Sequence, residues 1–114
     1  MPEGPLAYDV LSSHSYDMRI LAVMEHILEH SDDPSKRIDE LGHRIDEAIE
    51  SIRTFPNKNQ VYHTMMDGRP VRGMIIDKGQ YVLKYSVNDD ERTVTIVSIS
   101  STKQEDMLHP YRMM

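Results

Sequence analysis

The stretch GMIIDKGQYVLKYSVNDDERTVTIVSISSTKQED, residues 73–106, contains the strongest fold signal in this chain. Tyr, Leu, Tyr and Val occupy every second position of YVLKYSV, and RTVTIVSISS is rich in β-branched side chains. Period-two alternation and β-branching are typical of strands, while Lys78-Gly79 and the acidic run 88–91 are typical of the turns between them. The pattern predicts three consecutive strands, over Val71–Asp77, Tyr81–Val87 and Arg92–Ser101.

Two amphipathic helices are predicted upstream, at about Tyr16–His30 and Pro34–Thr54. Each has an apolar stripe at spacings of three and four residues, which places the stripe on one helix face and predicts that it belongs to the core. The stripes are Ile20, Leu21, Met24, Ile27 and Leu28 in the first helix and Ile38, Leu41, Ile45, Ala48, Ile49 and Ile52 in the second. In the short connection SDDP, Asp33 can cap the second helix, and Pro34 needs no N–H there, so we expect an antiparallel hairpin. Gly42 is interpreted as a point of close packing.

The remaining segments complete one α+β domain. Leu6–Ser12 predicts a short first strand, and residues 57–70 predict a loop anchored by Val61 and Tyr62. The resulting order, β-α-α-β-β-β, favours a helical hairpin packed on a small antiparallel sheet. We expect a single domain over residues 1–114, with an ordered core at about 6–106 and a C-terminal tail over 107–114.

The composition excludes several classes of protein. The chain has 114 residues and no cysteine, so disulfides, thiolate metal sites and thiol nucleophiles are unavailable to it. Its formal net charge of −6, from 13 Lys and Arg against 19 Asp and Glu, argues against a general nucleic-acid binder, whose affinity depends on neutralising phosphates. No apolar run reaches the roughly 18 residues that span a membrane, and MPEGPLAYDV has no secretory-signal pattern. We therefore expect a cytoplasmic protein with no membrane partner.

The chain resembles the RelE/ParE superfamily, the toxins of type II toxin–antitoxin systems, also known as the plasmid stabilisation protein family. The resemblance covers about Tyr8 to Asp106, and three segments carry it: YDVLSSHSYDMRILAVMEHILEH, RIDELGHRIDEAIESIRTFPNKNQVY and VRGMIIDKGQYVLKYSVNDDERTVTIVSIS. It implies a RelE/ParE-like fold and a cognate antitoxin that covers part of the toxin surface. RelE-like members cut mRNA on the ribosome, whereas ParE-like members inhibit DNA gyrase, so the fold alone does not choose the target.

The chain departs from the pattern of the RNA-cleaving members at two places. Those members often carry Arg on the middle strand, where this chain has Val82, and they are strongly basic after the last strand, where it has SSTKQED at 100–106. We therefore expect a growth-inhibiting toxin that binds a protein target, as ParE-like proteins bind gyrase. A metal-independent, ribosome-dependent mRNA interferase with an atypical site is the first alternative. A non-toxic relative that keeps only antitoxin binding is the second.

Four residues are candidates for catalysis if the chain is a ribonuclease. RNA cleavage of this kind needs cations at the phosphate and groups that move protons. Among the basic and aromatic groups that remain, we then expect Arg72 and Lys103 to hold the phosphate and His109 or Tyr111 to transfer protons. The alternative is that all four are solvated surface residues. If the chain is a ribonuclease, alanine at Arg72 or His109 should restore growth to cells that express it.

No metal or other cofactor is expected. His26 and His30 have the i, i+4 spacing of a zinc-binding pair, but no third ligand is evident, and a solvated helix face is the better interpretation. An exposed sheet edge is the expected antitoxin site, because an unpaired strand can accept an added strand. The sequence does not determine the oligomeric state, and a homodimer is one possible state.

Overall fold

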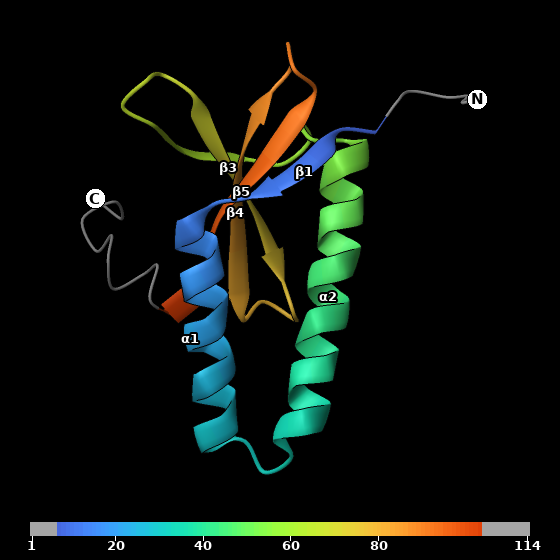
Figure 1. The fold of residues 1–114 in the computed structure, drawn as a ribbon, viewed down its shortest axis with the longest axis vertical. Helices are drawn as coiled ribbons and strands as arrows, with labels where there is room; N and C mark the ends of the chain where they lie inside the picture. Colours follow the sequence, from blue (N-terminus) through green and yellow to red (C-terminus); the bar gives the residue numbers. More distant parts are fainter. Residues whose placement is uncertain (1–6, 104–114) are drawn as a thin grey trace.

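The computed structural model describes residues 7–103, which form two long helices over one face of a five-stranded sheet (Figure 1). The elements follow the chain as β1 (Asp9–Ser12), α1 (His14–His30), α2 (Pro34–Thr54), β2 (Val61–Thr64), β3 (Pro70–Ile76), β4 (Tyr81–Asn88) and β5 (Thr93–Ser101). The predicted α+β class, the helical hairpin and the three C-terminal strands are confirmed, with one strand added.

The sheet has the order β1-β5-β4-β3-β2 and is mixed, which corrects the expectation of an antiparallel sheet at one edge. β1 pairs with β5 in parallel, with Val10 opposite Val94. The remaining pairs are antiparallel. The chain leaves β1, passes through both helices and three strands, and only then returns beside it, so the direction of this edge is set by long-range pairing.

The added strand, β2, lies in the segment that was expected to be a loop. It has only four residues and pairs with β3 through a register shift between Val61 and His63. A segment this short and interrupted by a bulge shows no sustained alternation of apolar and polar residues. It can therefore be recognised as a strand only from its pairing with β3.

Both helices begin at the capping residues that their sequences offer. The Ser13 hydroxyl accepts a hydrogen bond from the Tyr16 N–H at 3.0 Å, and α1 therefore begins at His14, two residues before the predicted start. The Asp33 carboxylate accepts from the Lys36 N–H at 3.3 Å, and Pro34 occupies the first turn of α2 as predicted. The Ser13 hydroxyl also donates to the Val97 carbonyl at 2.9 Å, which fastens the start of α1 to β5.

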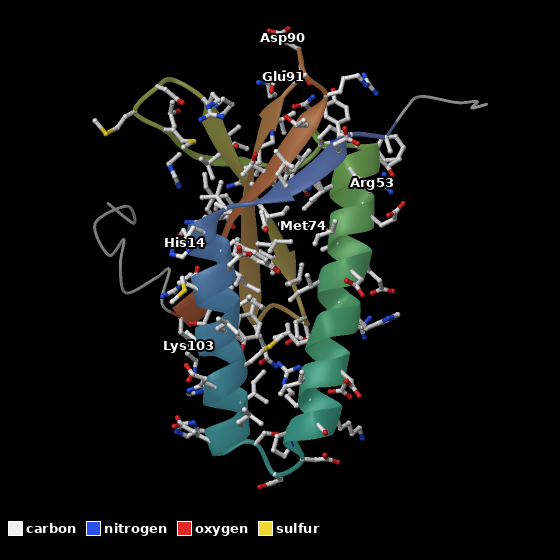
Figure 2. All side chains as sticks on the ribbon, in the orientation of Figure 1. His14, Arg53, Met74, Asp90, Glu91 and Lys103 are labelled. Carbon is white, nitrogen blue, oxygen red and sulfur yellow. The ribbon has the colours of Figure 1, made fainter. Side chains whose placement is uncertain are left out.

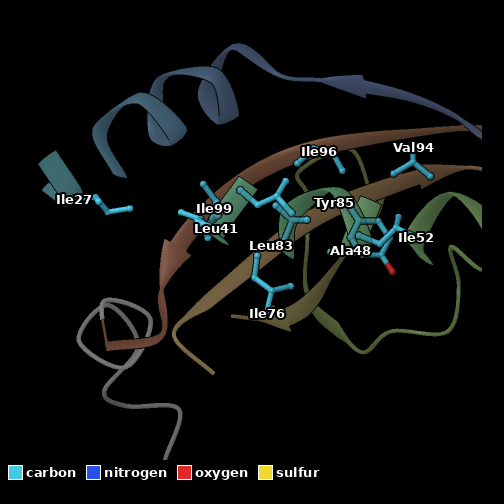
Figure 3. Close-up of a cluster of buried hydrophobic side chains, with 11 residues drawn as sticks. Ile27, Leu41, Ala48, Ile52, Ile76, Leu83, Tyr85, Val94, Ile96 and Ile99 are labelled. Atoms are coloured by element: carbon cyan, nitrogen blue, oxygen red, sulfur yellow. The ribbon is translucent and has the colours of Figure 1, made fainter. Parts of the chain in front are cut away.

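The core lies between α2 and the facing side of the sheet, with a smaller contribution from α1 (Figure 3). The predicted α2 stripe is confirmed, since four of its six members are buried and the other two, Ile38 and Ile49, are partly buried against the core. The buried cluster consists of Ile27, Leu41, Ile45, Ala48, Ile52, Ile76, Leu83, Tyr85, Val94, Ile96 and Ile99. Alternation along β4 therefore turns Tyr85 and Leu83 toward the helices and leaves Lys84 on the other face.

Two packing predictions are corrected. Leu21 and Leu28 of α1 are exposed, Leu28 at 59%, because the helix turns Ile20, Val23 and Ile27 to the core and no described layer covers its other side. Gly42 is not a close-packing point, since a Cβ there would have nothing within 4 Å.

Candidate functional site

Arg72, the first predicted phosphate ligand, lies on β3 and holds the loop that follows α2. It is directly opposite Tyr85 in the β3–β4 ladder, so it belongs to the face of the sheet that the helices cover. Its Nη1 donates to the Asn59 carbonyl at 2.6 Å. Its Nε is buried and makes no hydrogen bond within the described residues. These contacts make Arg72 a residue that positions the segment around Asn59.

Lys103, the second predicted phosphate ligand, lies near the opposite end of the same strands. Ser101 pairs with Tyr81, whereas Arg72 pairs with Tyr85, so four residues of β4, about 13 Å, separate the two levels. Figure 2 shows Lys103 beside α1, far from Asp90 and Glu91 at the tip of the β4–β5 hairpin. The structure therefore does not bring Arg72 and Lys103 to one phosphate. His109 and Tyr111 lie outside the described residues, so their roles stay predictions.

Around Arg72, a network of hydrogen bonds fastens the segment after α2 to the sheet. The Tyr85 hydroxyl donates to the Pro56 carbonyl at 2.8 Å and accepts from the Asn59 side-chain amide at 3.0 Å. Burial raises the pKa of the Tyr85 phenol, and the hydrogen bond from Asn59 opposes that rise. The phenol therefore stays protonated and donating at neutral pH, as its bond to Pro56 requires.

A second set of hydrogen bonds joins the segment just before β1 to the β4–β5 hairpin. The Tyr8 hydroxyl donates to Asp89 Oδ1 at 2.6 Å, and the Asn57 side-chain amide donates to the same oxygen at 3.4 Å. These two hydrogen bonds, Tyr8 first, lower the pKa of Asp89. The carboxylate is thus ionised and engaged at neutral pH.

On the face of the sheet away from the helices, Lys84 and Tyr62 form a cation–π pair that the sequence did not predict. Lys84 is only 6% exposed, and its Nζ lies 5.4 Å from the centre of the Tyr62 ring. The ring lies over Gly73, where a Cβ would be 2.5 Å from Tyr62 Cε1. Alternation indicated the direction of Lys84, but Tyr62 was assigned to a loop, so no sequence signal joined the pair.

The two histidines of α1 stack on each other rather than opening toward a shared ligand. The His26 and His30 ring centres are 4.3 Å apart, and His30 Nδ1 lies 3.0 Å from the His26 carbonyl oxygen. Within residues 7–103, no group of three His, Cys, Asp or Glu side chains could hold a metal ion.

The two edges of the described sheet are β1 and β2. Both strands are four residues long and mostly exposed. The β2–β3 hairpin beyond the second edge ends in the fully exposed Met66. Its turn is held by Arg69, whose Nε donates to Asp67 Oδ2 at 2.9 Å. The described sheet therefore has two edges, β1 and β2, at which the predicted docking could occur. The β2 edge continues into a hairpin tip with an exposed apolar side chain.

Comparison with solved structures identifies the fold. No protein-family model matches the chain, and no curated protein matches its sequence. The crystal structure of the archaeal RelE–RelB complex from Pyrococcus horikoshii OT3 superposes with a TM-score of 0.51 at 15% identity, covering 84% of this chain and 96% of the matched chain. The chain therefore has the RelE-like fold that its sequence resemblance implied. Neither described helix is long and apolar enough to cross a membrane.

Proposed function

We propose that this chain is the toxin of a type II toxin–antitoxin module, that a cognate antitoxin neutralises it, and that it inhibits growth by binding a protein target, DNA gyrase. The RelE-like fold supports the toxin assignment, and the matched solved structure is itself a complex of RelE with RelB. A fold alone does not set an activity, so the choice of target rests on the candidate residues.

The placement of Arg72 carries the choice of a protein target over RNA. Stabilising a phosphate transition state requires cations that converge on one point. The Arg72 guanidinium is instead engaged with the Asn59 carbonyl, and Lys103 is at the other end of the strands. The remaining lysine of the middle strand, Lys84, lies against the Tyr62 ring and is almost fully buried. Within residues 7–103, this arrangement favours a binding surface over a nuclease site.

The antitoxin site that we propose is the β2 edge. The strand lies at the end of the described sheet, so one row of its backbone groups faces away from β3. An extended antitoxin segment could pair with that row and cover Val61, which is exposed.

The test is growth of a bacterial host after tightly controlled induction of the chain alone, followed by pulse-labelling of DNA and protein synthesis. We expect growth arrest in which DNA synthesis falls first, and inhibition of supercoiling when the purified chain is added to gyrase. A first fall in protein synthesis with cleaved mRNA would instead establish the ribonuclease alternative. Unimpaired growth with soluble, folded protein would instead support the alternative that the chain is a non-toxic relative that keeps only antitoxin binding.

Variants of the candidate catalytic residues distinguish the proposed protein target from the ribonuclease alternative. Lys103→Ala should leave arrest unchanged, as should its control Lys36→Ala, because both side chains are exposed and neither would act in catalysis. His109→Ala and Tyr111→Phe should also leave it unchanged. Arg72→Ala needs a parallel measurement of thermal stability, since it removes the bond that holds Asn59. Loss of arrest in Lys103→Ala or His109→Ala, with folding intact, would contradict the proposal.

A further inference from the structure

The outer face of α1 carries a row of apolar side chains that the described residues leave exposed. Met18, Leu21 and Leu28 are 54%, 55% and 59% exposed, although they lie on a long helix whose opposite face packs on the core. Together with Glu25 they have spacings of three, four and three residues, which places all four in one row along the helix. We call these four residues the α1 seam. It is separate from the candidate catalytic residues and from both edges of the sheet.

The spacing of the seam matches the packing surface of a second helix. In Figure 1, α1 lies in front of the sheet beside α2, and the seam extends along it for about 15 Å. Side chains spaced alternately by three and four residues interlock with a facing helix that has the same spacing. An extended strand presents a side chain to one face at every second residue, which does not match this row. The seam therefore favours a helical occupant.

The carboxylates of α1 lie in or beside the seam and have no cationic partner there. Asp17, Glu25 and Glu29 are exposed, and none of them forms an ion pair within residues 7–103. Glu25 and Glu29 are four residues apart, so they repel each other on the helix surface. In contrast, Glu47 and Glu50 of α2 each pair with an arginine of their own helix. A cation supplied by a partner would give the carboxylates of α1 the pairing that their own helix does not.

The cations near α1 lie on the side of the helix that faces the sheet. Arg19 is the one Lys or Arg of α1, and its Nε donates to the Ile99 carbonyl at 3.3 Å. Lys103 lies beside α1 in Figure 2, two residues after Ser101, which lines a cavity together with Arg19. Over the whole helical hairpin, residues 14–54, ten Asp and Glu outnumber five Lys and Arg. Because charges are screened over about 8–10 Å, the nearby carboxylates dominate the potential at the seam.

From these features we infer that the α1 seam binds an amphipathic helix of a partner protein that carries Lys or Arg beside its apolar row. The apolar side chains of that helix pack on Met18, Leu21 and Leu28, and one of its cations faces Glu25. The Ser13 hydroxyl caps α1 and fastens it to β5, so the seam is ordered before binding and loses little conformational entropy. The inference rests on the proposed function in one respect, that the chain works by binding proteins.

Other occupants fit the seam less well. With a second copy of the chain, Glu25 would face Leu21 of the other copy if the two helices were antiparallel, and the other copy's Glu25 if they were parallel. Either arrangement takes a carboxylate out of water without a cation to pair with it. Nucleic acids and anionic membrane surfaces are repelled by the same carboxylates.

The test is a titration of the isotope-labelled full chain with the basic amphipathic peptide acetyl-KLAKLAKKLAKLAKKLAK-amide, followed through backbone amide NMR signals. The leucines of this peptide have the same alternating spacing of three and four residues as the seam. We expect shifts concentrated at Met18, Leu21, Glu25 and Leu28, with a dissociation constant of about 1 mM or tighter that strengthens as salt is lowered.

Two pairs of variants separate the apolar contact from the charge contact. Leu21→Ala should weaken binding about ten-fold, whereas its control Ile75→Ala, which truncates an equally exposed side chain on β3, should not. Glu25→Lys should also weaken it about ten-fold, whereas its control Glu91→Lys, at the tip of the β4–β5 hairpin in Figure 2, should not. All four side chains are exposed, so the variants should melt close to the parent.

Four results would overturn the inference. The peptide acetyl-KLALKALKKLALKAKKAK-amide, which has the same composition but leucines all around the helix, could bind as tightly, or the acidic peptide acetyl-ELAELAEELAELAEELAE-amide could do so. The shifts could fall elsewhere or be absent. Light scattering could show a homodimer that Leu21→Ala dissociates, which would assign the seam to a second copy. The assay requires no toxicity, so peptide binding without growth arrest would refute the proposed function and leave the α1 seam assigned. Arrest without peptide binding would do the reverse.

Discussion

Arg37 of α2 forms a two-point ion pair with Asp77 in the turn between β3 and β4. Arg37 Nη1 donates to Asp77 Oδ1 at 3.4 Å, and Nη2 donates to both Asp77 Oδ2 and, at 3.2 Å, Gln80 Oε1. The Asp77 side chain is 7% exposed and the Arg37 side chain 23%. The pair joins the start of α2 to the turn between β3 and β4, and so links the helix layer to the sheet.

Arg37→Met should lower the free energy of unfolding by about 1.5–3 kcal/mol, because it leaves the buried Asp77 carboxylate without its charged partner. Chemical denaturation measures this. Arg44→Met is the control, since Arg44 pairs with the exposed Glu47 and such a surface pair is worth at most about 1 kcal/mol. Equal losses in the two variants would mean that Asp77 is solvated in solution.

The same turn has a residue that should gain from replacement. Lys78 is exposed and has φ 57, a left-handed conformation that disfavours most side chains and that Asn tolerates. Lys78→Asn should raise the free energy of unfolding by about 0.5–1 kcal/mol. Gly79→Ala, at φ 86 in open space, should lower it by about 1–2 kcal/mol, so the pair of variants changes stability in opposite directions. Thermal melts of both provide the comparison.

Two glycine-to-alanine changes should also have opposite signs. Gly42→Ala should stabilise α2 by about 0.5–1 kcal/mol, because nothing lies within 4 Å of the added methyl group. Gly73→Ala should destabilise the chain, because the new Cβ would lie 2.5 Å from the Tyr62 ring. Tyr62→Ala combined with Gly73→Ala should be less harmful than the sum of the single changes. If the changes in the free energy of unfolding were strictly additive, Tyr62 would not be in contact with Gly73.

The Tyr8–Asp89 bond should make stability depend on pH at both ends of the scale. The hydrogen bond lowers the pKa of Asp89, so its contribution is present above the unfolded value of about 4 and is lost as pH falls through the folded pKa. It raises the pKa of Tyr8, so that contribution is present below about 10 and is lost as pH rises through the folded pKa.

The melting-temperature difference between the parent and Tyr8→Phe should therefore be largest between about pH 5 and pH 9 and should shrink beyond both limits. Asp89→Asn should abolish the acid limb and serves as the control. A difference that stays constant across the range would mean that Tyr8 acts through packing alone.

Local sequence signals determined both helices and the three C-terminal strands. Asp33 and Pro34 define the start of α2 because a cap and a first-turn proline act on their own backbone neighbours. Alternation likewise placed Tyr85 and Lys84 on opposite faces of β4, because neighbouring strand side chains point in opposite directions. These interactions lie within a few residues of each other, so the sequence by itself suffices for them.

Only the tertiary structure decided how distant segments meet. The parallel pairing of β1 with β5, the short strand β2 and the exposed flank of α1 all depend on partners far along the chain. Arg72 was identified as a cation, but its hydrogen bond to Asn59 depends on where the segment after α2 returns to the sheet. Tyr8 and Asp89, which are 81 residues apart along the chain, likewise meet only in the folded structure. Loop closure and packing, rather than local preference, set these contacts, and they leave no periodic pattern in the sequence.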